Sequence, residues 1–151
     1  MSAYPPALNE VIEFFEILPE AERRENLINY SDAAAACVPK EGETFEVEDV
    51  RKDEECTDTV GVYLRTDADD NAHFAITLGP KVQTLTKAMT AILCRGLNGS
   101  PISQILDTPA DFVPRIIGAE LVRLRSQTVY YVLSRMKTAA KMLLDRRRAA
   151  K

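Results

Sequence analysis

The chain has 151 residues, of which 46% are hydrophobic and 28% charged, a balance typical of one soluble globular domain. No apolar run approaches the roughly 18 residues that a membrane span needs, and residues 1–6 contain no basic or apolar leader. We therefore expect a single domain over residues 1–151 with disordered or frayed ends at 1–6 and 146–151. It should contact no membrane and lie in the cytoplasm, or in an organelle after processing.

The formal net charge of −4 is unevenly distributed along the chain. Residues 40–58 carry nine acids and three bases, whereas residues 115–151 carry ten bases and two acids. The two regions can offset each other within the fold, or they can form a docking surface for a protein partner. Nucleic acid is a weaker interpretation because the basic run 146–148 has no interleaved aromatic residues and the whole chain is acidic.

Two apolar stretches at helical spacing predict a pair of N-terminal helices. The first follows Pro5–Pro6 and carries its apolar residues from Leu8 to Leu18. Pro19 can close it and open the next helix, which we expect over residues 21–36. Pro39 and Gly42 then end the helical pattern.

Three strands are expected next, and together they predict an antiparallel meander. Residues 45–50 form a weak strand candidate, residues 60–64 alternate apolar and other side chains, and residues 72–78 alternate most clearly. A turn over residues 69–71 suits a hairpin between the last two. His73 falls on the face away from the core set, which favours a surface role over catalysis.

Helices are expected from residue 82 to the C-terminus. One covers residues 82–97, and the last runs from about 123 to 148. Ser100–Pro101 and Thr108–Pro109 each resemble an N-cap followed by a proline in the first helical position. The order of elements gives an α+β fold: a three-stranded antiparallel meander with two N-terminal helices and several C-terminal helices packed on it.

The three cysteines, Cys37, Cys56 and Cys94, form no C-x-x-C pair, which favours free thiols in a reducing compartment. With His73 as the single histidine, we expect no metal site and no resident cofactor. Cys37 and Cys94 lie in helical, apolar surroundings and are interpreted as small core residues. Cys56 differs, because it lies in the polar turn between the first two strands, where a hairpin holds a side chain in reach of solvent.

This pattern of two helices, a strand, a turn with one cysteine, two more strands and then helices resembles the SufE family. The family's core segment reads roughly Val-x-Gly-Cys-x-Ser-x-Val-Trp. Cys56 and Val60 match it, whereas the glycine, serine and tryptophan positions hold Glu55, Asp58 and Gly61. The resemblance spans about residues 7–141 and includes the stretch 121–125, whose last residue, Arg125, matches a family arginine.

The resemblance implies the fold given above and a role as a sulfur acceptor in iron–sulfur cluster assembly. Cys56 would take a persulfide sulfur from a pyridoxal-phosphate cysteine desulfurase of the SufS or CsdA type and pass it to an iron–sulfur scaffold. Arg125 would belong to the partner or persulfide environment. The acids around Cys56, from Asp53 to Asp58, disfavour a thiolate and predict a thiol that reacts slowly until a partner binds.

Two other functions fit the same residues. A SufE-like adaptor or regulator would bind the desulfurase without carrying sulfur, as the altered motif positions allow. A cysteine-based hydrolase or redox enzyme would need a base or a second thiol near Cys56, and neither His73, Cys37 nor Cys94 is evidently placed for that.

Overall fold

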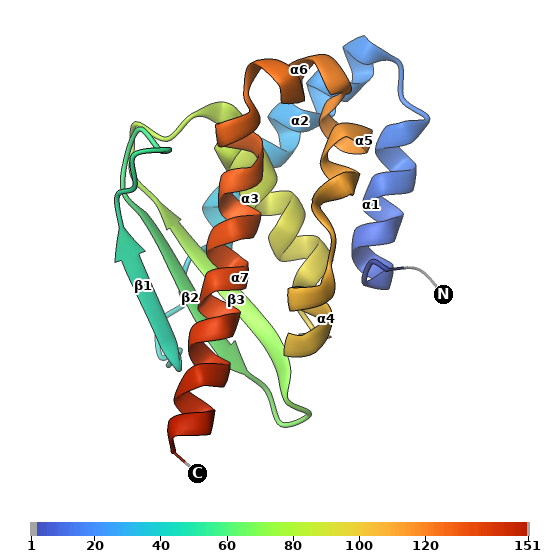
Figure 1. Ribbon diagram of the computed structural model, residues 1–151. Helices are drawn as coiled ribbons and strands as arrows, with labels where there is room; N and C mark the ends of the chain where they lie inside the picture. Colours follow the sequence, from blue (N-terminus) through green and yellow to red (C-terminus); the bar gives the residue numbers. More distant parts are fainter. Residues whose placement is uncertain (1–2, 151) are drawn as a thin grey trace.

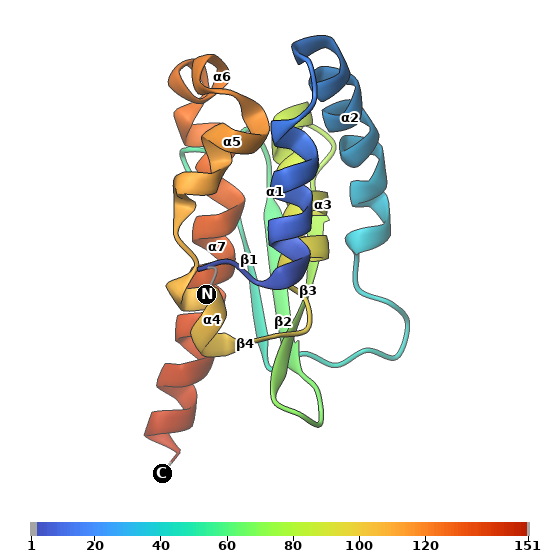
Figure 2. The ribbon, with the colours of Figure 1, turned by 90° about the vertical axis from the view of Figure 1, so that its right-hand side faces the viewer.

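The computed structural model describes residues 3–150, which form one α+β arrangement with helices gathered on one face of an antiparallel sheet (Figures 1 and 2). The helices are α1 (Pro6–Glu16), α2 (Glu20–Ala33), η1 (Ala34–Cys37), α3 (Thr84–Leu97), α4 (Ile102–Asp107), η2 (Ala110–Phe112), α5 (Val113–Ile117), α6 (Ala119–Leu124) and α7 (Ser126–Ala149). The strands are β1 (Val47–Arg51), β2 (Val60–Thr66), β3 (Asn71–Leu78) and β4 (Ser100–Pro101).

The sheet has four strands in the order β1-β2-β3-β4, and all neighbours are antiparallel. The expected three-stranded meander is present as β1 to β3, and the sheet has a fourth strand, β4, that the sequence did not predict. Ser100 pairs with Ala72 and Pro101 with Asn71, so this dipeptide extends the sheet edge, and Ser100 is not the N-cap that the sequence predicts. Pro101 is itself the N-cap of α4, without a side-chain cap.

The core lies between the sheet and helices α3 and α7. Val60, Val62 and Leu64 of β2 are fully buried, as the alternating pattern predicts. Their β3 partners include Ile76 and Phe74, which face the same helices. Helix α1 covers α3 from outside, and the two views show α3 between α1 and the sheet (Figure 2).

Three expected helix boundaries differ from the structure. Helix α2 tightens into the 3₁₀ segment η1 at Ala34 instead of running to residue 36. Thr108 ends α4, because its hydroxyl donates to the Gln104 carbonyl at 2.7 Å, and it does not cap a following helix. The last helix is broken at Arg125, where φ is −131°, so α6 and α7 replace the single helix expected from residue 123.

Both expected frayed ends contain ordered residues. Tyr4 is buried, its hydroxyl bonds to Asp111, and its ring packs edge-on against Phe112 at 5.7 Å between centroids. At the other end α7 continues to Ala149, and Arg146 donates to the Glu46 carbonyl at 2.6 Å. Met1, Ser2 and Lys151 lie outside the described residues.

Candidate functional site: the thiol between β1 and β2

Cys56 lies in the loop 52–59 that joins β1 to β2, at the end of the molecule where α6 and the start of α7 also lie (Figure 1). A tight turn forms the loop, since the Cys56 backbone N–H donates to the Asp53 carbonyl at 3.1 Å. The expected position between two strands is therefore correct. The turn alone does not keep the thiol in reach of solvent: Cys56, whose covering at rest the sequence left open, is only 8% exposed and belongs to the buried core cluster.

One end of this loop is held by Arg135 of α7, a residue that sequence reasoning missed. Its side chain is 2% exposed. The guanidinium donates to the carbonyl of Asp49 in β1 at 2.7 Å and to that of Val60 in β2 at 2.8 Å. Arg135 therefore joins the two strands at the point where they separate into the loop. The only sign of Arg135 in the sequence is that a charged residue stands within the apolar stripe of the last helix.

The same guanidinium compensates the acid at the start of the loop. Arg135 lies 3.6 Å from the Asp53 carboxylate and donates to the Tyr131 hydroxyl at 2.6 Å, which in turn donates to Asp53 at 2.9 Å. Burial raises the pKa of Asp53, but the hydrogen bonds from Tyr131 and Arg51 and the charges of Arg51 and Arg135 outweigh it and leave the pKa below its ordinary value. Burial and the bond to Asp53 raise the pKa of Tyr131 to about 12.

The other end of the loop is held by Asp58. Its carboxylate accepts the backbone N–H of Lys81 at 2.8 Å and that of Thr59 at 2.7 Å, and these bonds hold its pKa below the usual range. Thr57 adds a bond from its hydroxyl to the Lys81 carbonyl at 2.7 Å. Gly79 makes the approach possible, because a Cβ there would lie 2.3 Å from the Asp58 carboxyl carbon.

These contacts change the electrostatic expectation for Cys56. Two of the four acids near the thiol, Asp53 and Asp58, are bonded to cations or backbone N–H groups that offset their charge. Glu54 and Glu55 are exposed, where solvent screens them. The cations that compensate Asp53 are Arg51 and Arg135.

The altered motif positions also have local explanations. Asp58, at the family's serine position, supplies the bonds to Lys81 just described. Gly61, at the tryptophan position, faces Thr77 across the sheet, and a Cβ at residue 61 would lie 2.4 Å from the Thr77 hydroxyl oxygen. A tryptophan there would require the Thr77 side chain, at least, to shift.

Arg125 lies between α6 and α7 and is exposed. Within residues 3–150 its side chain has no hydrogen bond or ion pair to the loop 52–59. The start of α7, just after Arg125, reaches the loop only through the segment 79–83. Thr128 donates to the Gln83 side chain at 3.2 Å, and the Lys81 carbonyl accepts a hydrogen bond from Thr57 of the loop. Arg125 instead borders a cavity of about 520 Å³ together with Gln83 and Leu121.

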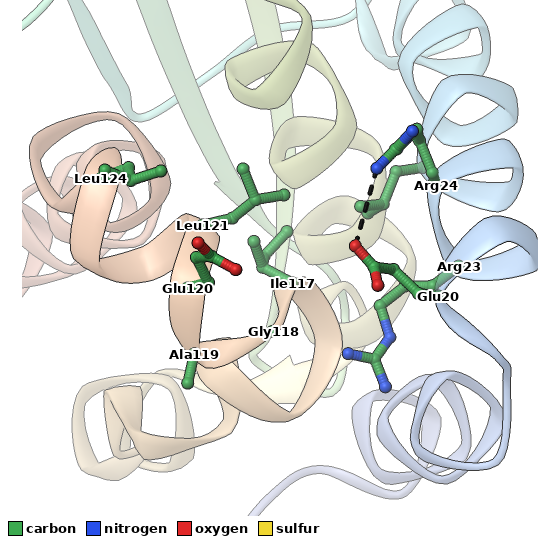
Figure 3. A pocket seen from close by; sticks show the side chains of 10 residues that line it. Glu20, Arg23, Arg24, Ile117, Gly118, Ala119, Glu120, Leu121 and Leu124 are labelled. Carbon is green, nitrogen blue, oxygen red and sulfur yellow. Dashed lines mark ion pairs between the residues drawn. The ribbon is translucent and has the colours of Figure 1, made fainter.

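A second hollow of about 520 Å³ lies between α2 and the corner of α5 and α6 (Figure 3). Arg23 points toward Gly118 in it, and the Glu20–Arg24 ion pair spans 3.6 Å at its edge. Cys56 borders neither hollow. Within the described part of the chain, no group of three or more His, Cys, Asp or Glu side chains is arranged to hold a metal ion.

Two further expectations concern the role of His73 and the absence of a membrane span. The His73 Nε2–H donates a hydrogen bond to the Asp67 carboxylate at 2.8 Å, far along β3 from the thiol, in line with the surface role expected. Of the helices that the structure describes, none combines the length and apolar character that crossing a membrane requires.

Comparison with known proteins places the chain in a family. The solution structure of a hypothetical protein from Thermus thermophilus has a TM-score of 0.73 at 22% identity, covering 94% of this chain and 98% of that one, which shows a shared fold. No curated protein matches the chain significantly. The family model "SufE: Fe-S metabolism associated domain" matches residues 9–140. This chain therefore belongs to the SufE family and to iron–sulfur metabolism.

Proposed function

We propose that this protein accepts sulfur on Cys56 from a cysteine desulfurase and relays it to an iron–sulfur scaffold. The observation that carries the proposal is the position of Cys56. It is the thiol at the family's cysteine position, in a loop that Arg135 and Asp58 hold at its two ends. The family's involvement in iron–sulfur metabolism supports the sulfur chemistry.

The proposed transfer needs no cofactor on this chain. The Cys56 thiolate attacks the terminal sulfur of a persulfide on the donor enzyme. The new S–S bond forms as the donor's S–S bond breaks, so the donor cysteine leaves as a thiolate and Cys56 carries the S–SH group. Charge, atoms and electrons balance, and no external oxidant or reductant takes part.

Burial of Cys56 gives the isolated protein a shielded thiol. At 8% exposure the sulfur cannot meet a donor persulfide without movement of the loop. The bonds of Thr57 and Asp58 to Lys81 are the contacts that such a movement must break, whereas the Arg135 contacts lie in the strands behind it. We therefore expect slow reaction in the free protein and faster reaction when the donor opens the loop.

Arg125 is proposed as a partner-contacting residue. Its exposure and its place at the same end of the molecule as Cys56 support contact with a bound desulfurase. Its lack of any bond to the loop favours that role over direct contact with the resting thiol. An Arg125→Ala protein should then bind the desulfurase more weakly and keep the alkylation rate of Cys56 unchanged.

The test is the intact mass of the protein after incubation with a cysteine desulfurase, pyridoxal phosphate and cysteine. Wild type and Cys37→Ser should each gain sulfur that a reductant removes, and Cys56→Ser should gain none. Sulfur on Cys56→Ser would contradict the proposal. No gain on wild type with the desulfurase still bound in a pull-down would identify the adaptor function instead.

A further inference from the structure

The other two cysteines lie together, on the far side of α3 from the loop that carries Cys56. Cys37 is the last residue of η1 and is half-buried, and Cys94 lies within α3 at 7% exposure. The 3₁₀ segment packs against α3. The two thiols are close enough for each to influence the ionisation of the other, and both border one cavity of about 420 Å³, which Cys56 does not border. The Cys37 sulfur also lies 3.9 Å from the Ala33 carbonyl oxygen. The two cysteines interpreted as unrelated core residues are therefore a dithiol pair.

The two thiols are not equivalent. The hydrogen bond from Cys94 lowers the pKa of Cys37 to about 7, although burial acts in the opposite direction. The bond to Cys37 and burial both raise the pKa of Cys94. Cys37, the more exposed of the two, is therefore the thiol with the greater thiolate character, and Cys94 is the one that favours its protonated form. This is the arrangement of an attacking thiol with a neighbouring proton-bearing thiol.

The cavity that reaches Cys37 carries an excess of positive charge. Its lining includes the cations Lys40, Arg65 and Arg95 and one acid, Glu43. Arg65 pairs with Glu43 at 3.0 Å, and Arg95 donates to the Tyr30 hydroxyl at 3.3 Å. These side chains give the cavity beside Cys37 a net positive charge. His73 also borders the cavity and bonds to Asp67.

Formation of a disulfide requires the two sulfurs to move closer together. A disulfide requires a separation of about 2.05 Å, closer than two hydrogen-bonded sulfurs. Cys94 is fixed in the interior of α3, but Cys37 ends η1 and precedes the irregular segment 38–46. The approach therefore falls to Cys37, on a segment with few helical bonds to break.

We propose that Cys37 and Cys94 form a peroxide-reactive dithiol, in which Cys37 attacks and Cys94 resolves. The Cys37 thiolate attacks one oxygen of hydrogen peroxide, the O–O bond breaks, and the departing hydroxide takes a proton to become water, leaving Cys37 as a sulfenic acid. The Cys94 sulfur then attacks the Cys37 sulfur. The S–S bond forms, the S–O bond breaks, and the hydroxyl leaves with the Cys94 proton as a second water.

Two thiols are oxidised to one disulfide in this sequence, and one hydrogen peroxide is reduced to two waters. The site is separate from the sulfur-accepting role, since none of its steps involves Cys56. A reductant such as a small dithiol restores both cysteines by thiol–disulfide exchange.

The test uses the full chain with Cys56→Ser, so that only the pair can react. Treatment with a small excess of hydrogen peroxide should remove two hydrogen atoms per monomer in the intact mass, reversibly with dithiothreitol. Peptide mapping should recover Cys37 joined to Cys94. A mass that does not change, or a disulfide that joins two chains, would overturn the proposal.

Two further variants in the Cys56→Ser background assign the roles. Cys94→Ala should stop at one added oxygen that dimedone traps on Cys37, whereas Cys37→Ala should leave Cys94 unreacted. Alkylation of Cys37 at pH 7 should fall about fivefold in Cys94→Ala, because its pKa returns toward the ordinary range while its intrinsic nucleophilicity rises. Faster oxidation of Cys94 in the absence of Cys37 would reverse the assignment and refute it. The Cys56→Ser measurement changes neither thiol, so it stands even where an alanine variant fails to fold.

Discussion

The sharpest test of the structure is the replacement of Arg135 by methionine. Methionine keeps an unbranched apolar side chain of similar length, so the change removes the guanidinium while it fills much of the space. Two buried strand carbonyls, of Asp49 and Val60, lose their donor, and the Asp53 carboxylate loses a cation at 3.6 Å. The strands β1 and β2 are then no longer joined at the base of the Cys56 loop.

The expected loss of stability depends on how deeply Arg135 is buried and on which ion pairs the variant keeps. Removing one partner of a buried ion pair costs about 3–5 kcal/mol. The lower end applies here because Arg51, 42% exposed, still pairs with Asp49 and Asp53 at 3.0 Å each. A loss of about 3 kcal/mol corresponds to a fall in Tm of about 6–12 °C for a chain of this size. Urea unfolding and calorimetry measure both quantities.

The difference in stability between wild type and Arg135→Met should also depend on pH, in a direction that the pKa of Asp53 fixes. The pKa of Asp53 in the folded protein lies below its ordinary 3.8, so its ionised form stabilises the fold. That stabilisation is complete above about pH 4 and is lost as the pH falls through the lowered pKa. The gap in stability between wild type and Arg135→Met should therefore narrow below pH 4.

Arg148→Met is the matched control, because Arg148 lies in the same helix with its side chain 78% exposed. It should change stability by less than about 0.5 kcal/mol. If Arg135→Met costs no more than Arg148→Met, or if its cost does not depend on pH, the account of the buried guanidinium is refuted.

Three further predictions concern the loop and the dithiol. Asp58→Ala should release the loop from Lys81 and speed alkylation of Cys56 several-fold, whereas a Glu54→Ala control, at an exposed position, should not; equal rates would show that Asp58 does not hold the loop. Gly79→Ala should have the same effect because its Cβ displaces Asp58, and the double variant should be no worse than Asp58→Ala alone; additive effects would contradict the clash. Oxidation of the Cys37–Cys94 pair closes a long loop and should raise the free energy of unfolding, measured with urea, by up to about 4 kcal/mol. An unchanged free energy of unfolding after verified disulfide formation would contradict this prediction and show that the disulfide strains the native state.

The fold was largely accessible from the sequence because its strands alternate cleanly. Val60 to Leu64 and Ala72 to Ile76 carry their large buried side chains on one face, as period two requires, and Ala75 is a small residue buried on the other face. The missed strand β4 has two residues, too short for any period, and its pairing with β3 is a tertiary contact. Helix boundaries moved for a similar reason, since Thr108 bonds backward to Gln104 instead of forward.

The site was accessible only in part. The position of Cys56 followed from the strands on either side of it, but its burial depends on packing that no local pattern encodes. Arg135 was missed because its partners, Asp49 and Val60, are distant in sequence and offer backbone carbonyls, which any residue type supplies. The contact of Cys37 with Cys94 likewise joins segments 57 residues apart.

The buried arginine and the acidic loop together explain how an acidic surrounding can coexist with the nucleophilic role proposed for Cys56. Four unpaired acids facing one thiol would disfavour its thiolate form. Here Asp53 is tied to Arg51, Tyr131 and Arg135, and Asp58 to the backbone of Lys81, so each is both neutralised and held in place. On the proposed function, these two acids are anchors that keep the thiol covered, so access would limit its reaction more than charge does. A partner that displaces Asp58 from Lys81 would expose Cys56, and the thiolate would not then face the repulsion of four unpaired carboxylates.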